Sequence, residues 1–301
     1  MKSTKIIIIT LAVALLLLAL SPVAKSQILD TTHVIRIKLP QSNEQFPAWS
    51  KDGTRLVFQS TIKGHSEIFL YDFTNDSLIQ VAGGKANMSH PVFIPGSNDI
   101  AYDKMEQDGS HLYKINLNSG NRELLFKRDI LCKASSFSPS GRLVAFIGWD
   151  KKSDTWQIFS YDFVYDNLNR LTNLKDKELY RPLFSPDGKT ILFGSRNKTN
   201  PFDFELHQIN WYGENLQKPD SIASTSYCWS TNGYRIVCAE TNHGKEFRLI
   251  TIRKDGTVPM CLSADTVQRI TPAYSPGGRK IAVAENRGNN FDIVIYNVAN
   301  E

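Results

Sequence analysis

Short apolar segments recur along the chain at a nearly constant spacing, and each follows a phrase rich in turn-forming residues. The phrase is clearest at Phe184-Ser185-Pro186-Asp187-Gly188, and its six copies end at residues 53, 97, 141, 188, 233 and 278. These ends are 44, 44, 47, 45 and 45 residues apart. A fixed period of roughly 40–50 residues indicates one supersecondary unit that is repeated along the chain.

Within each unit the pattern predicts β-strands. One apolar run follows the phrase directly, at 56–58, 100–102, 144–146, 191–193, 236–238 and 281–283. A second run with two-residue alternation comes after it, at 68–71, 112–115, 158–161, 206–209, 249–252 and 293–296. A weaker fourth segment, such as 78–81, ends the unit. Four antiparallel strands per unit, repeated radially, predict an all-β fold, a six-bladed β-propeller. No stretch of the mature chain keeps a 3.6-residue period, so almost no helix is expected.

The two ends of the repeat region predict how the ring closes. The sixth unit stops near the C-terminus with only three strands, whereas the segment 33–38 is strand-like and belongs to no complete unit. Insertion of this segment into the last blade would remove an open sheet edge. We therefore expect one domain over residues 27–301, with blades that start near residues 46, 90, 134, 181, 226 and 271.

Residues 1–26 are predicted to be a secretory signal peptide and not part of the fold. Lys2 and Lys5 precede an apolar run over 6–20, and Ala24-Lys25-Ser26 offers small residues at a cleavage site. The run is shorter than the roughly 20 residues that usually span a bilayer, so no membrane span is expected after cleavage. The sequence thus favours a periplasmic or secreted protein.

Charge changes this picture little. Removal of residues 1–26 takes away three lysines and no acid, so the formal charge falls from +5 to 32 − 30 = +2. No basic cluster of the kind that binds nucleic acid remains, and no nucleic-acid partner is expected. Four cysteines are present, Cys132, Cys228, Cys238 and Cys261. A Cys228–Cys238 bridge is conceivable, but Cys238 stands where other units have Phe, which favours a buried thiol.

The phrase Phe184-Ser185-Pro186-Asp187-Gly188-Lys189-Thr190-Ile191-Leu192-Phe193 closely resembles the repeat of the TolB-like β-propellers. The copies in units one, three and six are near matches, and the resemblance covers nearly the whole mature chain. It implies a non-enzymatic binding or scaffold protein of the cell envelope. It concerns the propeller alone, because the α/β domain that precedes the propeller in TolB is not expected here. The same repeat also occurs in serine peptidases and polysaccharide-processing enzymes, so fold alone does not give the function.

No motif in the sequence identifies a reaction. A nucleophile elbow, the zinc motif H-E-x-x-H and phosphate-binding glycine loops are all missing. His207 aligns with aromatic residues of the third strands and is expected to pack in a sheet. His65, His111 and His243 are expected in loops on one face, where solvation is favoured over metal binding. No metal or other cofactor is expected, and the balance lies against an enzyme. The alternative is a carbohydrate-active or other hydrolase or lyase with a site in the channel.

The best candidates for a binding site lie in the loops that enter the first strands, because these open near the central channel of a propeller. We consider the positions three and four residues before the aromatic residue of each phrase, and in units one and six also the position five residues before it. These positions form a mixed polar, aromatic and cationic set. From it we select Glu44, Gln45, His90, Lys133, Tyr180, Arg181 and Arg269. Such a set suits a protein segment, peptide or envelope glycan. The propeller itself is expected to be monomeric.

Overall fold

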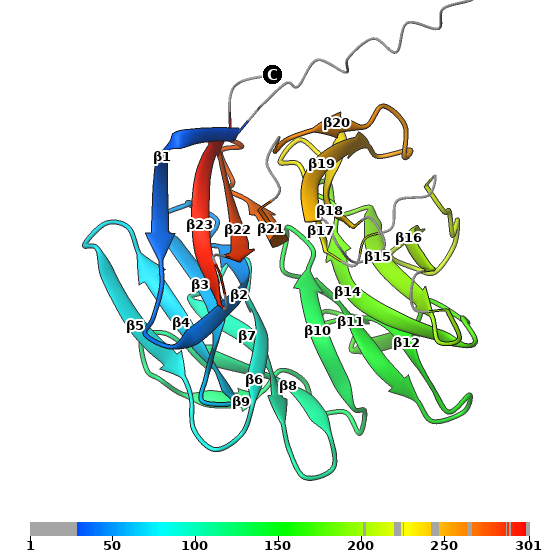
Figure 1. The fold of residues 1–301 in the computed structure, drawn as a ribbon. Helices are drawn as coiled ribbons and strands as arrows, with labels where there is room; N and C mark the ends of the chain where they lie inside the picture. The colour runs from blue at the N-terminus through cyan, green and yellow to red at the C-terminus, as the bar shows by residue number, and fades with distance from the viewer. Residues whose placement is uncertain are drawn as a thin grey trace, which may run out of the picture.

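The computed structural model describes residues 29–298 except 201–202, 220–223, 225, 242–246, 264–266, 287 and 289. The predicted signal peptide lies outside these residues. The described chain is all β, with six antiparallel sheets arranged as the blades of a propeller (Figure 1). This confirms the predicted fold class. No helix in the described part is long and apolar enough to cross a membrane.

The first three blades have four strands each. Blade one consists of β2 (Ser42–Trp49), β3 (Arg55–Ile62), β4 (His65–Asp72) and β5 (Ser77–Ala82). Blade two consists of β6 (Met88–Phe93), β7 (Asp99–Met105), β8 (Ser110–Asn116) and β9 (Arg122–Leu124). Blade three consists of β10 (Cys132–Phe137), β11 (Leu143–Asp150), β12 (Thr155–Asp162) and β13 (Asn167–Arg170).

The next blades are less regular at their outer edges. Blade four has three strands, β14 (Lys177–Phe184), β15 (Thr190–Asn197) and β16 (Phe204–Asn210), and an isolated bridge between Gln208 and Gln217 stands in place of the fourth. Blade five consists of β17 (Tyr227–Trp229), β18 (Arg235–Thr241), β19 (Phe247–Arg253) and β20 (Met260–Cys261).

The last blade joins the two ends of the fold. It contains β21 (Arg269–Tyr274), β22 (Lys280–Asn286) and β23 (Phe291–Val298), with β1 (Leu29–Ile37) as the outermost strand (Figure 1). The strand β1 runs antiparallel to β23, from the pair Leu29 and Val298 to the pair Ile37 and Ile293. This confirms the predicted closure, although the strand begins earlier than the segment 33–38.

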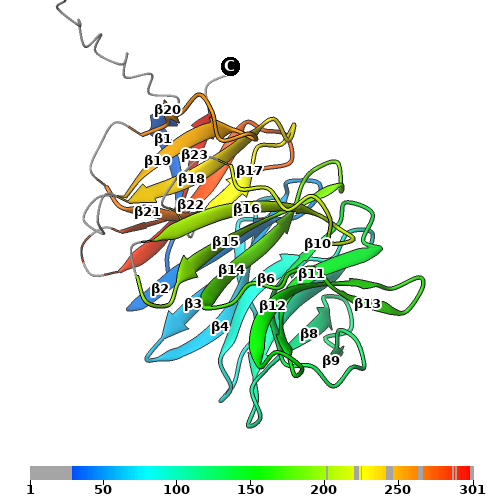
Figure 2. The same ribbon diagram turned by 90° about the vertical axis from the view of Figure 1, so that its right-hand side faces the viewer.

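Apolar clusters between neighbouring blades hold the ring together. In the described chain there is one buried cluster for each joint, including the joint between blades six and one, where Ile37 and Ala282 meet Leu56 and Phe58. Figure 2 shows blades four and five side by side, and Leu192 of β15 belongs to their shared cluster. Because each cluster draws on two blades, a blade cannot bury its apolar faces alone.

The cysteines fit this packing. All four are free, and Cys228 and Cys238 lie in different clusters on the two faces of blade five. Burial raises the pKa of Cys132 and Cys228 to about 12, so neither is a thiolate at neutral pH. The prediction of buried thiols at Cys228 and Cys238 is confirmed.

Candidate functional site

The innermost strands share a repeated irregularity close to the propeller axis. Five of them, β2, β6, β10, β14 and β21, shift register at the same place, three residues before the phrase aromatic. We call the residue at this position the ring residue. The six ring residues are Phe46, His90, Ala134, Arg181, Ser226 and Thr271. A bulge interrupts the two-residue alternation of a strand and re-aims its side chain.

Four ring residues adopt a backbone conformation that L-residues rarely use. The φ angles of Phe46, His90, Ala134 and Thr271 are 54, 48, 56 and 49°. A non-glycine residue with positive φ is uncommon, and its recurrence in several blades marks a feature built into the repeat. The repeat therefore places the ring residue at the same irregularity in each of the five strands that shift register.

Five of the six ring residues line one cavity, which we call the axial pocket. Its volume is about 430 Å³. The lining consists of Gln45, Phe46, His90, Tyr180, Arg181, Ser226, Tyr227, Gln268, Ile270, Thr271 and Phe291. Only Ala134 is left out, because its small side chain is buried in the joint between blades three and four. Aromatic walls with a few convergent polar groups are typical of ligand sites.

Arg181 is the one cation in the lining of this pocket. No described residue accepts a hydrogen bond from its guanidinium, and none forms an ion pair with it. Burial lowers the pKa of Arg181, while Tyr227, Cys228 and Asp103 act in the opposite direction. Arginine nevertheless keeps its charge in proteins. The pocket thus holds a partly desolvated positive charge that has no direct hydrogen-bond or ion-pair partner among the described residues. Such a site favours an anionic ligand group.

The backbone on both sides of Arg181 is held firmly. The hydroxyl of Tyr227 donates toward the carbonyls of Tyr180 and Arg181, at 3.3 and 2.8 Å, and accepts the N–H of Gly194. Burial raises the pKa of Tyr227, so the phenol stays protonated and remains a donor. Blade five in this way fixes the place on blade four from which the guanidinium extends.

His90 is oriented by a second set of contacts. Its Nδ1 lies 2.7 Å from Oδ2 of Asp103, and the two oxygens of Asp103 accept the backbone N–H of Ala134 at 2.9 and 3.0 Å. The imidazole also packs on Phe46, with 4.3 Å between ring centroids. Asp103 is buried, so the imidazole is held from behind, and Nε2 is the ring atom left for a ligand.

The residues selected from the sequence divide into two groups. Gln45, His90, Tyr180 and Arg181 line the axial pocket. Glu44, Lys133 and Arg269 do not: Glu44 is buried against Ser42 and Ser60, Lys133 lies over Trp156, and Arg269 is buried against Glu285 and Tyr296. The first group stays a prediction of a binding site.

Several lining residues were not selected. Phe46, Ser226 and Thr271 occupy the ring position, and their spacing before the phrase aromatic was the available signal. Tyr227 lies one residue after the ring residue of blade five, and Gln268 and Phe291 come from elsewhere in blade six. No sequence signal pointed to these three.

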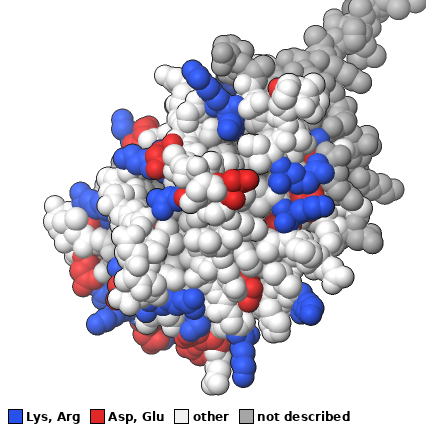
Figure 3. All heavy atoms as spheres, turned by 90° about the vertical axis from the view of Figure 1, so that its left-hand side faces the viewer, with Lys and Arg blue, Asp and Glu red and all other residues white. Residues whose placement is uncertain are grey.

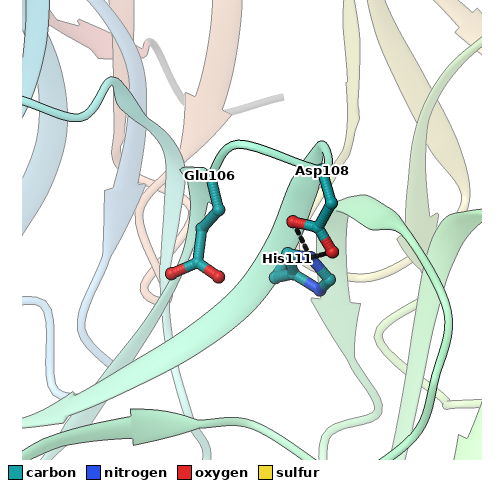
Figure 4. Close-up of side chains that lie close together, drawn as sticks. All are labelled: Glu106, Asp108 and His111. Carbon is teal, nitrogen blue, oxygen red and sulfur yellow. Dashed lines mark hydrogen bonds and ion pairs between the residues drawn. The ribbon is translucent and has the colours of Figure 1, made fainter.

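A separate group of possible metal ligands lies at the turn between β7 and β8. Ligand atoms of Glu106, Asp108 and His111 lie within 4.8 Å of one another (Figure 4). However, Glu106 Oε1 already accepts from Lys104 Nζ and from the Tyr113 hydroxyl, each at 2.7 Å. These two donors lower the pKa of Glu106. The cluster is explained as a local ion-pair network on an exposed turn.

The histidines behave partly as expected. His207 is buried and stacks on Phe193 at 4.9 Å between centroids, which confirms its predicted packing in a sheet. His65 and His111 were expected in loops but lie at the starts of β4 and β8, because both strands begin sooner after the turn than the apolar pattern indicates. His243 lies outside the described residues.

Charges of both signs are mixed on the face drawn in Figure 3, where Lys and Arg lie among Asp and Glu. That face lacks the clustered basic surface that nucleic-acid binding requires. The absence of a nucleic-acid partner stays a prediction.

Comparison with known proteins identifies relatives of this propeller. The family model described as "TolB beta propeller domain" matches residues 80–267. The Tol-Pal system protein TolB of Francisella tularensis is 26% identical over 166 residues, which cover 53% of this chain and 38% of the relative. The chain therefore spans about two fifths of the length of the curated relatives that it matches.

Solved structures with similar folds include proteins of different kinds. TolB from Acinetobacter baumannii has a TM-score of 0.61 at 16% identity, over 86% of this chain and 65% of that one. A putative TolB from Agrobacterium tumefaciens has a TM-score of 0.65 at 20% identity, over 86% and 92%. An oligogalacturonate lyase in complex with manganese has a TM-score of 0.60 at 11% identity, over 88% and 93%. At these identities the likeness concerns the fold alone.

Proposed function

The chain belongs to the TolB β-propeller family, and from the axial pocket we propose that it is an exported, non-enzymatic binding protein of the cell envelope. In this proposal the propeller holds a carboxylate-bearing segment of a partner protein in the axial pocket. The carboxylate belongs to an acidic side chain or to the C-terminus of that segment, and neighbouring apolar residues of the segment pack on the aromatic walls. The matched relatives are named as Tol-Pal system proteins, which supports a protein partner.

The charge of Arg181, which lacks a direct hydrogen-bond or ion-pair partner among the described residues, carries the proposal. A guanidinium forms two parallel hydrogen bonds to a carboxylate, and charge-assisted bonds of this kind are about twice as strong as neutral ones. Phe46, Tyr227 and Phe291 line the same pocket, and an apolar surrounding strengthens such a charged hydrogen bond. Tyr180, Gln45 and Gln268 stand close by to orient the rest of the segment.

The proposal is tested by photo-crosslinking in living cells. A photoreactive amino acid replaces Thr271, which lines the pocket, and in a matched control it replaces Val164, which is 67% exposed on the turn between β12 and β13. We expect a stoichiometric envelope protein to crosslink to position 271 only, and the crosslink to disappear in R181M. Crosslinks that are equal at both positions, or that are unchanged by R181M, contradict the proposal.

A second candidate function rests on the pair His90 and Asp103. An imidazole oriented by a buried carboxylate, next to a cation that can neutralise a substrate carboxylate, is an arrangement suited to proton abstraction in a lyase. The corresponding substrate is a glycan that contains uronic acids. Turnover of such a glycan, followed by the ultraviolet absorbance of the unsaturated product and lost in H90F, would favour this function over simple binding.

A further inference from the structure

The turns of the repeated phrase form a second ring at the far ends of the innermost strands. They comprise residues 50–53, 94–97, 138–141, 185–188, 230–233 and 275–278. In each, the N–H of the last residue donates to the carbonyl of the first, as from Gly188 to Ser185 at 2.9 Å. The last residue is glycine in five of the turns, with φ between 69 and 75°. We call this set the turn ring.

At five of the six joints, a side chain or backbone of one blade fills the space beside the glycine of the next. A Cβ added at Gly188 would lie 3.1 Å from Cδ of Pro139, and one at Gly141 would lie 2.6 Å from the carbonyl oxygen of Pro95. At the other three joints the nearest atoms, at 3.4 to 3.7 Å, come from Pro186 beside Gly233, Thr231 beside Gly278 and Pro276 beside Gly53. Four of the five joints are thus filled by a proline.

The sixth joint, between blades one and two, lacks both residues of this contact, the filling proline or threonine and the glycine. Blade one carries Lys51 where the other blades carry proline or threonine, and blade two carries Ser97 where the others carry glycine. In blade two the positive φ lies one residue earlier, at Gly96 with 81°, so this turn takes a different shape. No atom lies within 4 Å of a Cβ placed at Gly96.

A cavity of about 520 Å³ lies at this joint. Its lining consists of residues 49–52, Arg55, residues 93–97 and Pro139. Trp49, Phe93 and Ile94 supply apolar walls, and Arg55 lies over the Phe93 ring, 5.4 Å from its centroid, with Nη1 donating to Asn98 at 3.0 Å. The cavity shares no lining residue with the axial pocket.

The charges at this cavity are not balanced among the groups that line it. Lys51 is exposed and makes no hydrogen bond or ion pair with any described residue. The carboxylate of Asp52 accepts from Ser50 Oγ at 2.6 Å and from the N–H of Thr54 at 3.0 Å, and these bonds lower the pKa of Asp52 to about 2. Asp52 is thus held in the turn through Oδ1 and stays ionised, whereas the ammonium group of Lys51 has no partner among the described residues and is available to a ligand.

We infer that this cavity is a second binding site, which takes a proline-containing extended segment of a partner protein with an acidic residue beside the proline. The chain itself shows what fits, because proline ring atoms lie nearest to the glycine at three other joints and a proline carbonyl does so at a fourth. Aromatic-lined grooves bind proline-rich segments with a low entropy cost, since these segments are already extended. Lys51 supplies the counter-charge for the acidic neighbour.

The test uses fluorescence anisotropy with a labelled peptide of four Glu-Pro-Pro repeats, and with the matched peptide of four Lys-Ala-Ala repeats. The variant K51P supplies the missing ring from within the chain and fills the cavity. The matched control T231P introduces the same residue at a joint that is already filled. Both replacements stand at a turn position where proline is favoured.

We expect saturable binding of the Glu-Pro-Pro peptide to the wild type, a loss of at least tenfold in K51P and a change of less than twofold in T231P. K51A, which removes the charge and leaves the cavity, should reduce the preference for the acidic peptide. The proposal fails if neither peptide binds, if both bind alike, or if K51P and T231P weaken binding equally.

Sedimentation velocity tests whether a second copy of this chain occupies the cavity instead. Self-association of the wild type that K51P abolishes and T231P retains would assign the cavity to a second copy of this chain and overturn the proposal. R181M is expected to leave peptide binding at this cavity unchanged. A failure here is therefore distinct from a failure of the proposed function at the axial pocket.

Discussion

Two arginines on innermost strands, Arg181 of β14 and Arg269 of β21, have opposite surroundings. Arg269 is 1% exposed, and its Nε lies 2.8 Å from Glu285 Oε2, while Nε and Nη2 face the Tyr296 hydroxyl at 3.3 and 3.1 Å. Arg181 reaches a cavity and meets no such partner among the described residues. Both were selected from the sequence as binding residues. The contrast teaches that two cations at similar places in the repeat differ in their surroundings: Arg269 pairs with an acid on the next strand, whereas Arg181 faces a cavity and is available to the proposed ligand.

The largest effect is expected from the loss of the paired arginine. R269M leaves Glu285, which is fully buried, with one less counter-charge, while Arg36 lies 3.6 Å away. Removal of one partner of a buried ion pair typically lowers the free energy of unfolding by about 3–5 kcal/mol. Urea unfolding followed by circular dichroism measures this loss. A loss below about 1 kcal/mol would show that Arg269 is not a structural residue.

The unpaired arginine should matter for binding instead. R181M removes the counter-charge of the proposed ligand carboxylate, and truncation of one partner of such a pair costs about 2–5 kcal/mol of binding free energy. The affinity for the protein captured at position 271 is the quantity to measure, with R181K as the control that keeps the charge and loses the bidentate geometry. Equal affinity of wild type and R181M would refute the role of Arg181.

The same substitution sharpens the comparison when stability is measured. Arg181 has no direct ion-pair partner among the described residues, so R181M leaves no buried acid there without its counter-charge. We therefore expect R181M to change the free energy of unfolding by less than about 1 kcal/mol, and toward higher stability because a partly desolvated charge is removed. A side-by-side urea titration with R269M provides the contrast. Equal destabilisation by both variants would mean that the two environments are energetically alike.

A buried acid without a cationic partner should give the smallest effect. Burial raises the pKa of Glu44, while bonds from Ser42 and Ser60 oppose the shift. A raised folded-state pKa means that the folded state binds the proton more tightly, so stability falls as the pH rises from the unfolded toward the folded pKa.

E44Q removes this penalty and keeps the shape of the side chain. It should be more stable than the wild type at pH 8, and the difference should vanish at pH values below the unfolded-state pKa. Thermal unfolding at several pH values measures the difference. A stability gain that does not depend on pH would exclude the ionisation of Glu44 as its cause.

Residues that line the axial pocket could be located from the sequence where the repeat itself carried the information, and their role in binding stays a prediction. The ring position is fixed relative to the phrase aromatic, so residues such as His90 and Arg181 could be located by counting. Arg269 lies only two positions before the ring residue Thr271. It precedes the bulge between Ile270 and Ala273, so it is still in regular pairing with β22. Its pairing partner Glu285 stands directly opposite on β22, a relation that becomes visible only when the register is known.

The sequence by itself determined the repeat, the number of blades and the closing strand, because these follow from local turn chemistry and from a period that recurs six times. Tertiary structure alone decided which charges are paired and which joint of the turn ring is left open. Those properties depend on neighbours that lie on other strands or other blades, such as Glu285 opposite Arg269 and Pro139 beside Gly188. A local pattern contains the residues of such contacts but not their distances, and in a low-dielectric interior those distances set the electrostatic energy.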